Sequence, residues 1–313
     1  MCRAPEISKR PRVSREREFA MPLVSMKVML ENARREGYAA CYCESWNLES
    51  LQAVVEAAEA EKSPIIAGFN GGFLLHSGQT TLEQLGYYAA LRAALSRARV
   101  PVTFLLNESD SFEQIAQAID LGFDAVMPEN EDLPKEEYLH LVHQVVEKAH
   151  AHGVTVEAQV GHLADASGGT EAHPTDPEEA RAFVNATHID ALGIAVGNVH
   201  ILTSGKRSLD LSALERIRAA VEIPLVLHGG TGIPLELAAR CVQLGVAKVN
   251  FGTGLKQAYL AAVRENLAHY KEPMSPHPFL GMGGKHDILI AGREAVKAEV
   301  VKLVRAFGSS GKA

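Results

Sequence analysis

Short apolar runs alternate with segments of helical periodicity along almost the whole chain. Each run is continuously apolar, which is typical of parallel strands that are covered on both faces. The pattern predicts eight β-strands, at residues 39–45, 64–70, 100–107, 125–129, 155–160, 191–196, 224–229 and 248–253. Eight β/α units indicate a (β/α)8 TIM barrel. A doubly wound open sheet is the alternative, but its strand count would be unusually high, and no G-x-G-x-x-G motif follows the first strand.

Capping residues support the helices between these strands. Three helical patterns end in a glycine just before a strand, as suits a left-handed C-cap: Gly122, Gly153 and Gly245. Asp176 followed by Pro177 is typical of an N-cap and first helical position. We also expect residues 24–37 to form a helix that closes the bottom of the barrel, and the tail at 291–313 to contain one more helix.

The ends of the chain define the expected domain organisation. Residues 1–20 mix basic and acidic side chains with two prolines and hold no apolar run of signal-peptide length. We therefore predict a disordered arm at 1–20 and a single barrel domain at 21–313.

Composition excludes several kinds of partner. The chain has 313 residues, 47% of them hydrophobic, and a formal net charge of -7, whereas nucleic-acid binding calls for a basic surface. No stretch reaches the roughly 18 apolar residues of a membrane span. Four cysteines in a chain this long indicate reduced thiols and a cytoplasmic protein. Cys41 and Cys43 share one face of a strand, where core packing is a better interpretation than a soft-metal site.

Polar side chains stand at the C-terminal ends of seven predicted strands, where the active site of a TIM barrel lies. We expect them to converge on one cavity: Cys43, Glu44, Ser45, Trp46, Asn107, Glu108, Glu129, Gln159, His162, Asn198, His200, His228 and Asn250. A single histidine beside a strand is more often a core residue than a ligand. His200 and His228 stand at neighbouring strand ends near carboxylates, and imidazole with carboxylate is a common ligand set for a divalent metal.

Glycine-rich segments follow the last two predicted strands. HGGTG contains Gly229 and Thr231, and VNFGTG contains Asn250 and Thr253. Loops of this kind at this place in a barrel bind phosphate through backbone N–H groups, although glycine can also be required by a tight turn alone. Lys206 could add a positive charge to this site.

These motifs resemble the class II, metal-dependent fructose-bisphosphate and tagatose-bisphosphate aldolases, from Met21 to the C-terminus. The segments that carry the resemblance include MPLVSMKVMLENAR, SFEQIAQAIDLGFDAVM, VVEKAHAHGVTVEAQVG, ALGIAVGNVH, IPLVLHGGTGIP and AFGSSGKA. The resemblance implies a barrel, a phosphate site and a divalent cation, usually zinc. It also implies that His200 and His228 bind the metal, and that phosphate is held by Gly197, Gly229, Thr231, Asn250 and Thr253.

The chain departs from the family pattern at the residues of the catalytic core. Where such aldolases carry Asp-His-Gly after the third strand, with Asp in proton transfer and His on zinc, this chain has Asn107, Glu108 and Ser109. Gln159 replaces the usual glutamate of the fifth strand, and Glu44 the usual asparagine after the first. The aspartate that often follows Thr253 is Gly254.

Two interpretations of Glu108 remain open. It can complete a two-histidine, one-carboxylate metal site, or it can stay free and act as the missing base, because the amide of Asn107 exchanges no useful proton near neutral pH. Asp110 and Ser111 are expected to cap the next helix. In the loop after the fifth strand, the family's catalytic acid corresponds to Asp165, Glu171 or His173, of which we favour Glu171.

The sequence thus predicts a metal-dependent carbon-carbon lyase that acts on a phosphorylated ketose or a related keto acid. Loss of the usual Asp and gain of Glu44 predict that fructose 1,6-bisphosphate is a poor substrate. A sugar-phosphate isomerase or epimerase and a non-catalytic phosphosugar-binding barrel are the alternatives. Zinc is the expected cation, with manganese or iron as alternatives, and relatives of this kind are usually dimers or tetramers.

Overall fold

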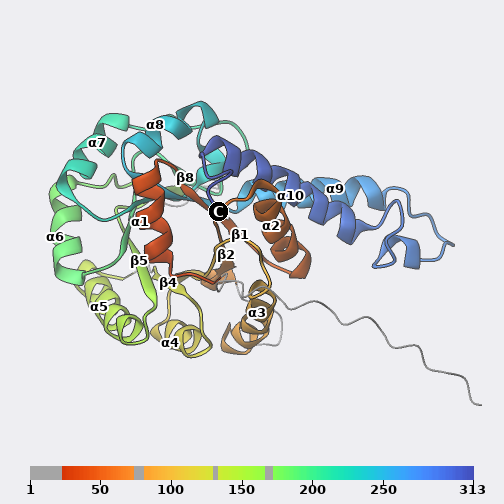
Figure 1. Cartoon of the computed structure of the whole chain (residues 1–313), viewed down its shortest axis with the longest axis horizontal. Helices are drawn as coiled ribbons and strands as arrows, with labels where there is room; N and C mark the ends of the chain where they lie inside the picture. Colours follow the sequence, from red (N-terminus) through yellow and green to blue (C-terminus); the bar gives the residue numbers. More distant parts are fainter. Residues whose placement is uncertain (1–22, 74–80, 130–132, 166–171) are drawn as a thin grey trace, which may run out of the picture.

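The computed structural model describes residues 23–73, 81–129, 133–165 and 172–313. The arm predicted at residues 1–20 and the loop residue Glu171 lie outside the described residues. Eight parallel strands form a closed barrel in the order β1-β10-β9-β7-β5-β4-β3-β2, which confirms the predicted (β/α)8 fold (Figure 1). The barrel strands are β1 (Ala40–Glu44), β2 (Ile65–Asn70), β3 (Val102–Ser109), β4 (Ala125–Pro128), β5 (Thr155–Val160), β7 (Ala191–Ile194), β9 (Leu225–Leu227) and β10 (Val246–Phe251).

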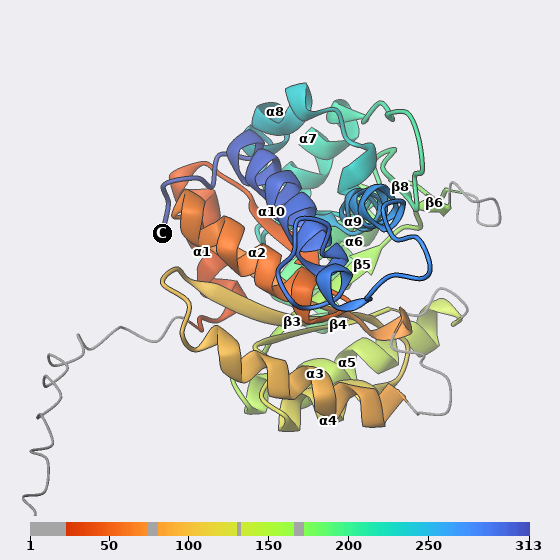
Figure 2. The ribbon, with the colours of Figure 1, turned by 90° about the vertical axis from the view of Figure 1, so that its right-hand side faces the viewer.

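Helices form the outer layer of the barrel. They are α2 (Leu48–Glu61), α3 (Thr81–Leu95), α4 (Phe112–Asp120), α5 (Lys135–Ala151), α6 (Pro177–Thr187), α7 (Leu211–Ala220), α8 (Ala238–Gln243), α9 (Thr253–Leu267) and α10 (Ile288–Ala306). Helices α3 to α5 cover one side of the strands, and α7 and α8 the opposite side (Figure 2). Strands such as β2, β5 and β10 are buried along their whole length, as their unbroken apolar runs predicted.

The bottom of the barrel is closed by α1 (Met26–Glu36), as predicted. Met26, Met29 and Leu30 of this helix pack against small inward-facing strand residues in one buried cluster. The strand positions in that cluster are mostly alanine and valine, including Ala40, Ala125, Ala191, Val226 and Ala247. A plugged lower end leaves only the C-terminal ends of the strands open to a ligand.

The predicted caps are present except at Asp110, which lines the cavity of the barrel while Ser111 caps the helix. Gly122, Gly153 and Gly245 have φ angles of 88°, 70° and 94°, which a residue with a Cβ rarely adopts. The Asp176 side chain accepts hydrogen bonds from the backbone N–H groups of the first turn of α6. Ser111 caps α4 by accepting from the Gln114 N–H at 3.2 Å.

Two local features differ from the predicted pattern. The segment 234–245 is not one helix, because Leu235–Leu237 forms a 3-10 turn before α8. A short parallel pair, β6 (Ala164–Asp165) and β8 (Val199–His200), lies outside the barrel sheet. Both strands are only two residues long, too short to leave a periodic signal.

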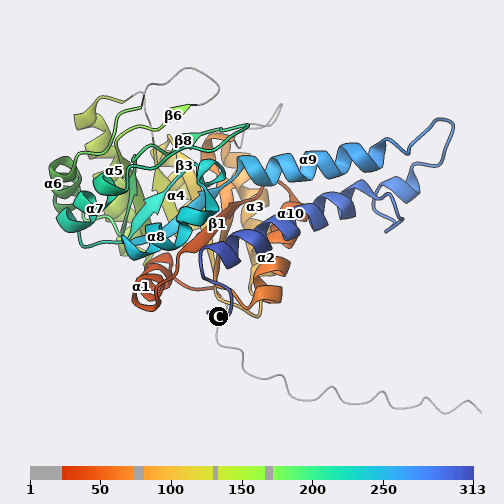
Figure 3. The ribbon, with the colours of Figure 1, turned by 90° about the horizontal axis from the view of Figure 1, so that it is seen from above.

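Helices α9 and α10 run side by side and project beyond the barrel (Figure 3). Helix α10 also packs against α2, which anchors the projection to the barrel wall. No helix within the described ranges combines the length and apolar character needed to span a membrane. Cys41, Cys43 and Cys241 are buried free thiols in the hydrophobic core, as expected for packing residues.

Candidate active site

A cavity of about 590 Å³ opens at the C-terminal ends of the barrel strands. Most of the residues that the sequence singled out line it: Glu44, Asn107, Glu108, Glu129, His200, His228, Gly229, Thr231, Asn250 and Thr253. The fifth strand does not contribute as expected, because Gln159 and His162 line a different cavity beside the barrel. Neither Gly197 nor Lys206 lines the barrel cavity.

A break in the β3–β4 pairing aims two of these side chains into the cavity. The register shifts between Leu106 and Ser109, and Glu108 adopts the left-handed region at φ 51°. A non-glycine residue in this region is uncommon, and such positions cluster at functional sites. Asn70 donates a short hydrogen bond to one Glu108 oxygen, and the Asn107 side chain hydrogen-bonds the same carboxylate. The bulge therefore presents Asn107 and Glu108 together.

His228 is held between two carboxylates. Its ring is fully buried, with Nδ1 2.9 Å from Glu108 Oε1 and Nε2 2.9 Å from Glu157 Oε1. Burial disfavours the imidazolium, but the hydrogen bonds to Glu108 and Glu157 outweigh it and raise the pKa of His228 to about 9. Burial likewise opposes ionisation of Glu108, yet its contacts with His228 lower the pKa of this carboxyl group to about 2. Carboxylates at both ring nitrogens therefore favour the imidazolium form of His228.

A buried ion pair lies below this histidine. Lys248 Nζ is 2.8 Å from Glu157 Oε2 and 2.6 Å from Asn250 Oδ1, and the side chains of Lys248 and Glu157 are both fully buried. The Asn250 amide nitrogen lies 3.1 and 3.2 Å from the two ring nitrogens of His228. Glu108, His228, Glu157 and Lys248 together carry no net charge, which makes their burial tolerable.

The described residues offer a set of donors for a cation. One ligand atom from each of Glu108, Glu129 and His228 lies within 4.8 Å of the others. Two carboxylates and one imidazole fit a divalent ion such as zinc, manganese or iron. The predicted set had His200 in place of Glu129, and the His200 ring centroid lies 6.0 Å from that of His228. Glu108 and His228 are common to both sets.

Glu44 faces the same cavity but is not free. Lys256 Nζ lies 2.6 Å from Glu44 Oε1 and 4.6 Å from the centre of the Phe73 ring. Burial raises the pKa of Glu44, although Lys256 opposes the shift. Trp46 beside it packs edge-on against Tyr259, with ring centroids 5.6 Å apart. Trp46 is therefore a packing residue here and does not line the barrel cavity.

The glycine loops meet at the rim of the cavity. The Gly254 N–H donates to Thr231 Oγ1 at 3.0 Å, and Lys206 Nζ donates to the Thr231 carbonyl at 2.7 Å. A Cβ on Gly229 would lie 2.0 Å from the Val199 carbonyl oxygen, so the backbone packing alone requires glycine there. Helix α9 starts at Thr253, and its N-cap residue Gly252 has no side chain to cap it. Thr231 Oγ1 takes up the Gly254 N–H, so the other N–H groups of the first turn are the ones available to an anion.

Sequence reasoning missed several residues of this network. Asn70, Glu157, Lys248 and Lys256 were not singled out, and Glu129 was noted only as a strand-end polar group. Glu157 and Lys248 did leave a signal, because each is a charged residue inside an apolar run of the kind that forms a buried strand. Asn70 and Lys256 left no such signal.

Comparison with known proteins identifies the family. A family model described as fructose-bisphosphate aldolase class-II matches residues 24–312. The chain belongs to this family. Its members are metal-dependent aldehyde-lyases, which confirms the predicted enzyme class.

Individual relatives match this chain along nearly its whole length. The fructose-bisphosphate aldolase of Geobacillus stearothermophilus is 40% identical over 299 residues, which cover 94% of this chain and 99% of that protein. The Staphylococcus epidermidis (strain RP62A) protein of the same name is 36% identical over 301 residues, covering 94% and 100%. The crystal structure of the YdjI aldolase from Escherichia coli K12 has a TM-score of 0.76 and 31% identity, and covers 93% of this chain and 99% of that one.

Proposed function

We propose that this class II aldolase family member cleaves a phosphorylated ketose or a related keto sugar acid other than fructose 1,6-bisphosphate, with a divalent cation. The observation that carries this proposal is the bulge at Asn107 and Glu108. It places an amide and a carboxylate in the cavity where the family pattern has a proton-transferring Asp and a zinc-binding His.

Glu108, His228 and Glu129 would hold the cation, with His200 close by. A cation held by Glu108 and His228 would compete with the proton of the hydrogen bond between them. The contact of His228 Nε2 with Glu157 would then orient the imidazole, as a carboxylate partner commonly does behind a metal-bound histidine. When bound, the cation supplies a Lewis acid for the ketone oxygen of the substrate. Zinc is the first choice, and the carboxylate-rich set also suits manganese or iron.

Amide groups line the rest of the reacting end. Asn107 and Asn250 are both nearly fully buried, and their side chains lie 3.4 Å apart between Asn250 Nδ2 and Asn107 Oδ1. Such amides can orient a substrate hydroxyl or carbonyl group but cannot transfer a proton near neutral pH. With Glu108 in the ligand set, proton transfer would fall to another carboxylate, for which the sequence offers Glu171 of the loop after β5.

The phosphate would be held at the rim by the loops of Gly229 and Thr231 and by the start of α9. Support comes from the start of α9 at Thr253, where the N-cap residue Gly252 provides no side-chain cap, and from the charge of Lys206, which is bonded to the Thr231 carbonyl. Gly197 has a backbone φ of 96° and packs against the 208–210 segment, so any role in phosphate binding would be indirect.

The geometry gives less support to an isomerase than to a lyase. An isomerase needs a base on each side of the reacting carbon, and the sequence offered Glu44 and Glu108. Glu44 is engaged by Lys256 and Glu108 by His228 and Asn70. Incubation with candidate ketose phosphates in deuterated water separates the two reactions. Recovered aldehyde supports the lyase, whereas label in an unfragmented substrate contradicts it.

Substitution Glu108→Ala is expected to lower the affinity for the divalent cation about 100-fold or more, because it removes a charged ligand from the set. Protein purified without chelator would be analysed for metal content, and its affinity for zinc and manganese measured by competition with a chromophoric chelator. Asp110→Ala is the matched control, since Asp110 is a neighbouring carboxylate that lines the same cavity outside the ligand group. Equal metal affinity in wild type and Glu108→Ala would contradict the assignment of Glu108 as a ligand.

We further propose a cytoplasmic homodimer or homotetramer. The projecting α9–α10 arm carries large apolar side chains that are mostly exposed in the single chain, including Leu260 at 64% and Met282 at 70%. Exposed apolar groups of this kind on one projection are typical of an interaction site. Sedimentation equilibrium is expected to give at least twice the chain mass of 33.7 kDa. A value of one chain mass at micromolar concentration would overturn this proposal.

A further inference from the structure

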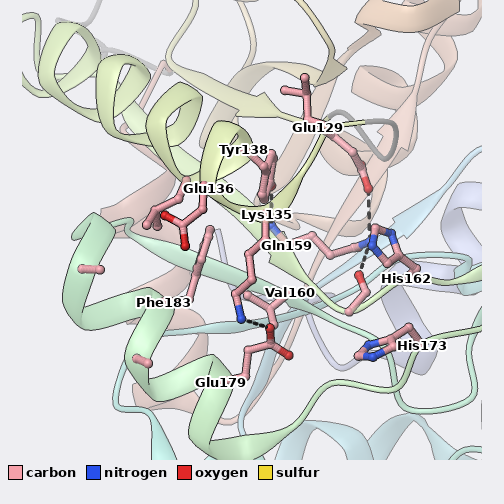
Figure 4. Close-up of a pocket in the computed structure, with 15 residues that line it drawn as sticks. Glu129, Lys135, Glu136, Tyr138, Gln159, Val160, His162, His173, Glu179 and Phe183 are labelled. Atoms are coloured by element: carbon pink, nitrogen blue, oxygen red, sulfur yellow. Dashed lines mark hydrogen bonds and ion pairs between the residues drawn. The ribbon is translucent and has the colours of Figure 1, made fainter.

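The proposed phosphate loops and the carboxylates of the barrel cavity stand on opposite sides of the barrel. The loops follow β9 and β10. In the closed sheet, β1 and β2 separate this pair from β3 and β4 on one side, and β7 and β5 separate them on the other. Glu108, Asp110 and Glu129 stand at the ends of β3 and β4. Gln159 holds the last of these by donating from Nε2 to Glu129 Oε1 at 3.1 Å (Figure 4). A sugar phosphate bound at the loops therefore extends its other end toward these carboxylates or along one of the two walls between.

The wall on the side of β5 and β7 offers little to a second anion. Apart from His200 it is apolar, with Leu163, Ile201 and Leu202 in the lining. Among the described residues that line the whole cavity there is no lysine or arginine. The internal segments outside the described ranges, 74–80, 130–132 and 166–171, contain neither residue type in their sequence. A divalent cation would offset the charge of Glu108 and Glu129, which leaves it as the partner of its own ligands.

On the side of β1 and β2, an ammonium group stands behind a carboxylate. Lys256, in the first turn of α9, has Nζ 2.6 Å from Glu44 Oε1 and 4.6 Å from the centre of the Phe73 ring. Glu44 and Phe73 line the cavity, whereas Lys256 does not. The Glu44 carboxylate also packs on Gly252, where a Cβ would lie 2.2 Å from Oε2. A ligand in the cavity therefore meets the carboxylate of this ion pair rather than its ammonium group.

We propose that the barrel cavity takes a ketose with one phosphate and an uncharged, hydroxyl-bearing far end, and that Glu44 excludes a second phosphate. Glu44 does so in two ways, because its charge repels the anion and because it engages Lys256. Hydroxyl groups of a sugar can instead donate hydrogen bonds to this carboxylate. The inference rests on the proposed function, since it takes the phosphate to lie at the loops of Thr231 and Thr253.

Isothermal titration calorimetry of the metal-loaded full chain tests this with mannitol 1-phosphate and mannitol 1,6-bisphosphate. The two probes differ only in the second phosphate. Neither has a ketone, so neither can be cleaved, and binding is measured apart from catalysis. The monophosphate is expected to bind at least about tenfold more tightly than the bisphosphate, because like charges face each other only in the second complex.

Substitutions at the ion pair identify the cause. Glu44→Gln keeps the side-chain size, removes the repelling charge and releases Lys256. It is expected to tighten binding of the bisphosphate at least about tenfold and to change that of the monophosphate less. Adding Lys256→Met should remove most of this gain. Glu59→Gln is the matched control, because it breaks an ion pair with Arg99 at 2.6 Å outside the cavity, and should leave the ratio of the two affinities unchanged.

Two results would overturn this inference and leave the proposed phosphate site standing. They are a wild type that binds the bisphosphate as tightly as the monophosphate, and an affinity ratio that Glu44→Gln does not change. No saturable binding of either probe would instead contradict the phosphate site itself, and the inference would be wrong with it. Circular dichroism establishes whether each variant is folded. Should Glu44→Gln fail to fold, the affinity ratio of the wild type still decides whether a second phosphate is excluded.

Discussion

The double substitution Asn107→Asp with Glu108→His is expected to raise kcat/KM for fructose 1,6-bisphosphate by at least about 100-fold. The change restores the residue types that the family pattern has after the third strand. An Asp at 107 supplies the proton-transfer group that an amide lacks, and such a group contributes typically 10²- to 10⁴-fold. A His at 108 replaces an anionic ligand by a neutral one and so strengthens the cation as a Lewis acid. Release of triose phosphate by metal-loaded protein measures the effect.

The single substitutions separate the two contributions. Glu108→His alone is expected to retain metal but to gain little activity, because the proton-transfer group is still absent. Asp110→Asn, a neighbouring change in the same cavity, is the matched control and should not raise the rate. If the wild type already cleaves fructose 1,6-bisphosphate with the efficiency of a metabolic aldolase, the proposed restriction to another substrate is wrong.

Lys248→Met is expected to lower the free energy of unfolding by about 3 kcal/mol, because it leaves Glu157 buried without its cation. This loss is at the low end of what breaking a buried ion pair usually costs, because His228 still contacts Glu157 at 2.9 Å. Methionine keeps most of the side-chain volume, so little of the loss would come from a cavity. Urea unfolding of metal-free protein, with its midpoint and slope, measures the difference.

Two controls isolate the charge effect at Lys248. Lys297→Met removes a lysine whose partner Glu56 is 3.3 Å away in a partly exposed pair, and should cost no more than about 1 kcal/mol. The double variant Lys248→Met with Glu157→Gln should recover part of the free energy of unfolding that Lys248→Met loses, because no buried charge is then left unpaired. If Lys248→Met and the double variant lose the same free energy of unfolding, the ion pair between Lys248 and Glu157 does not stabilise this part of the barrel.

Much of the fold could be predicted from local patterns. Continuous apolar runs identified all eight barrel strands because strands covered on both faces leave that signal in the chain itself. Glycines at 122, 153 and 245 marked helix ends because a left-handed cap is a property of one residue. The site could be located in part for a similar reason. Residues at the C-terminal ends of barrel strands tend to lie at the mouth, and this rule placed Asn107, Glu108, His200 and His228 at the cavity but failed for Trp46, Gln159 and His162.

Only the tertiary structure decided which of these groups touch. The contacts of His228 with Glu108 and Glu157 join residues 120 and 71 positions apart, and their formation depends on strand register and on the bulge after Leu106. The same geometry brought the Gln159 amide to Glu129 Oε1 at 3.1 Å, across 30 positions of the chain. The sequence by itself determined the barrel, the family and the altered motif, because these are written in local periodicity and residue type. The pairing of Glu157 with Lys248 and the grouping of Glu129 with the metal candidates required the closed barrel, because only closure brings distant strand positions within bonding distance.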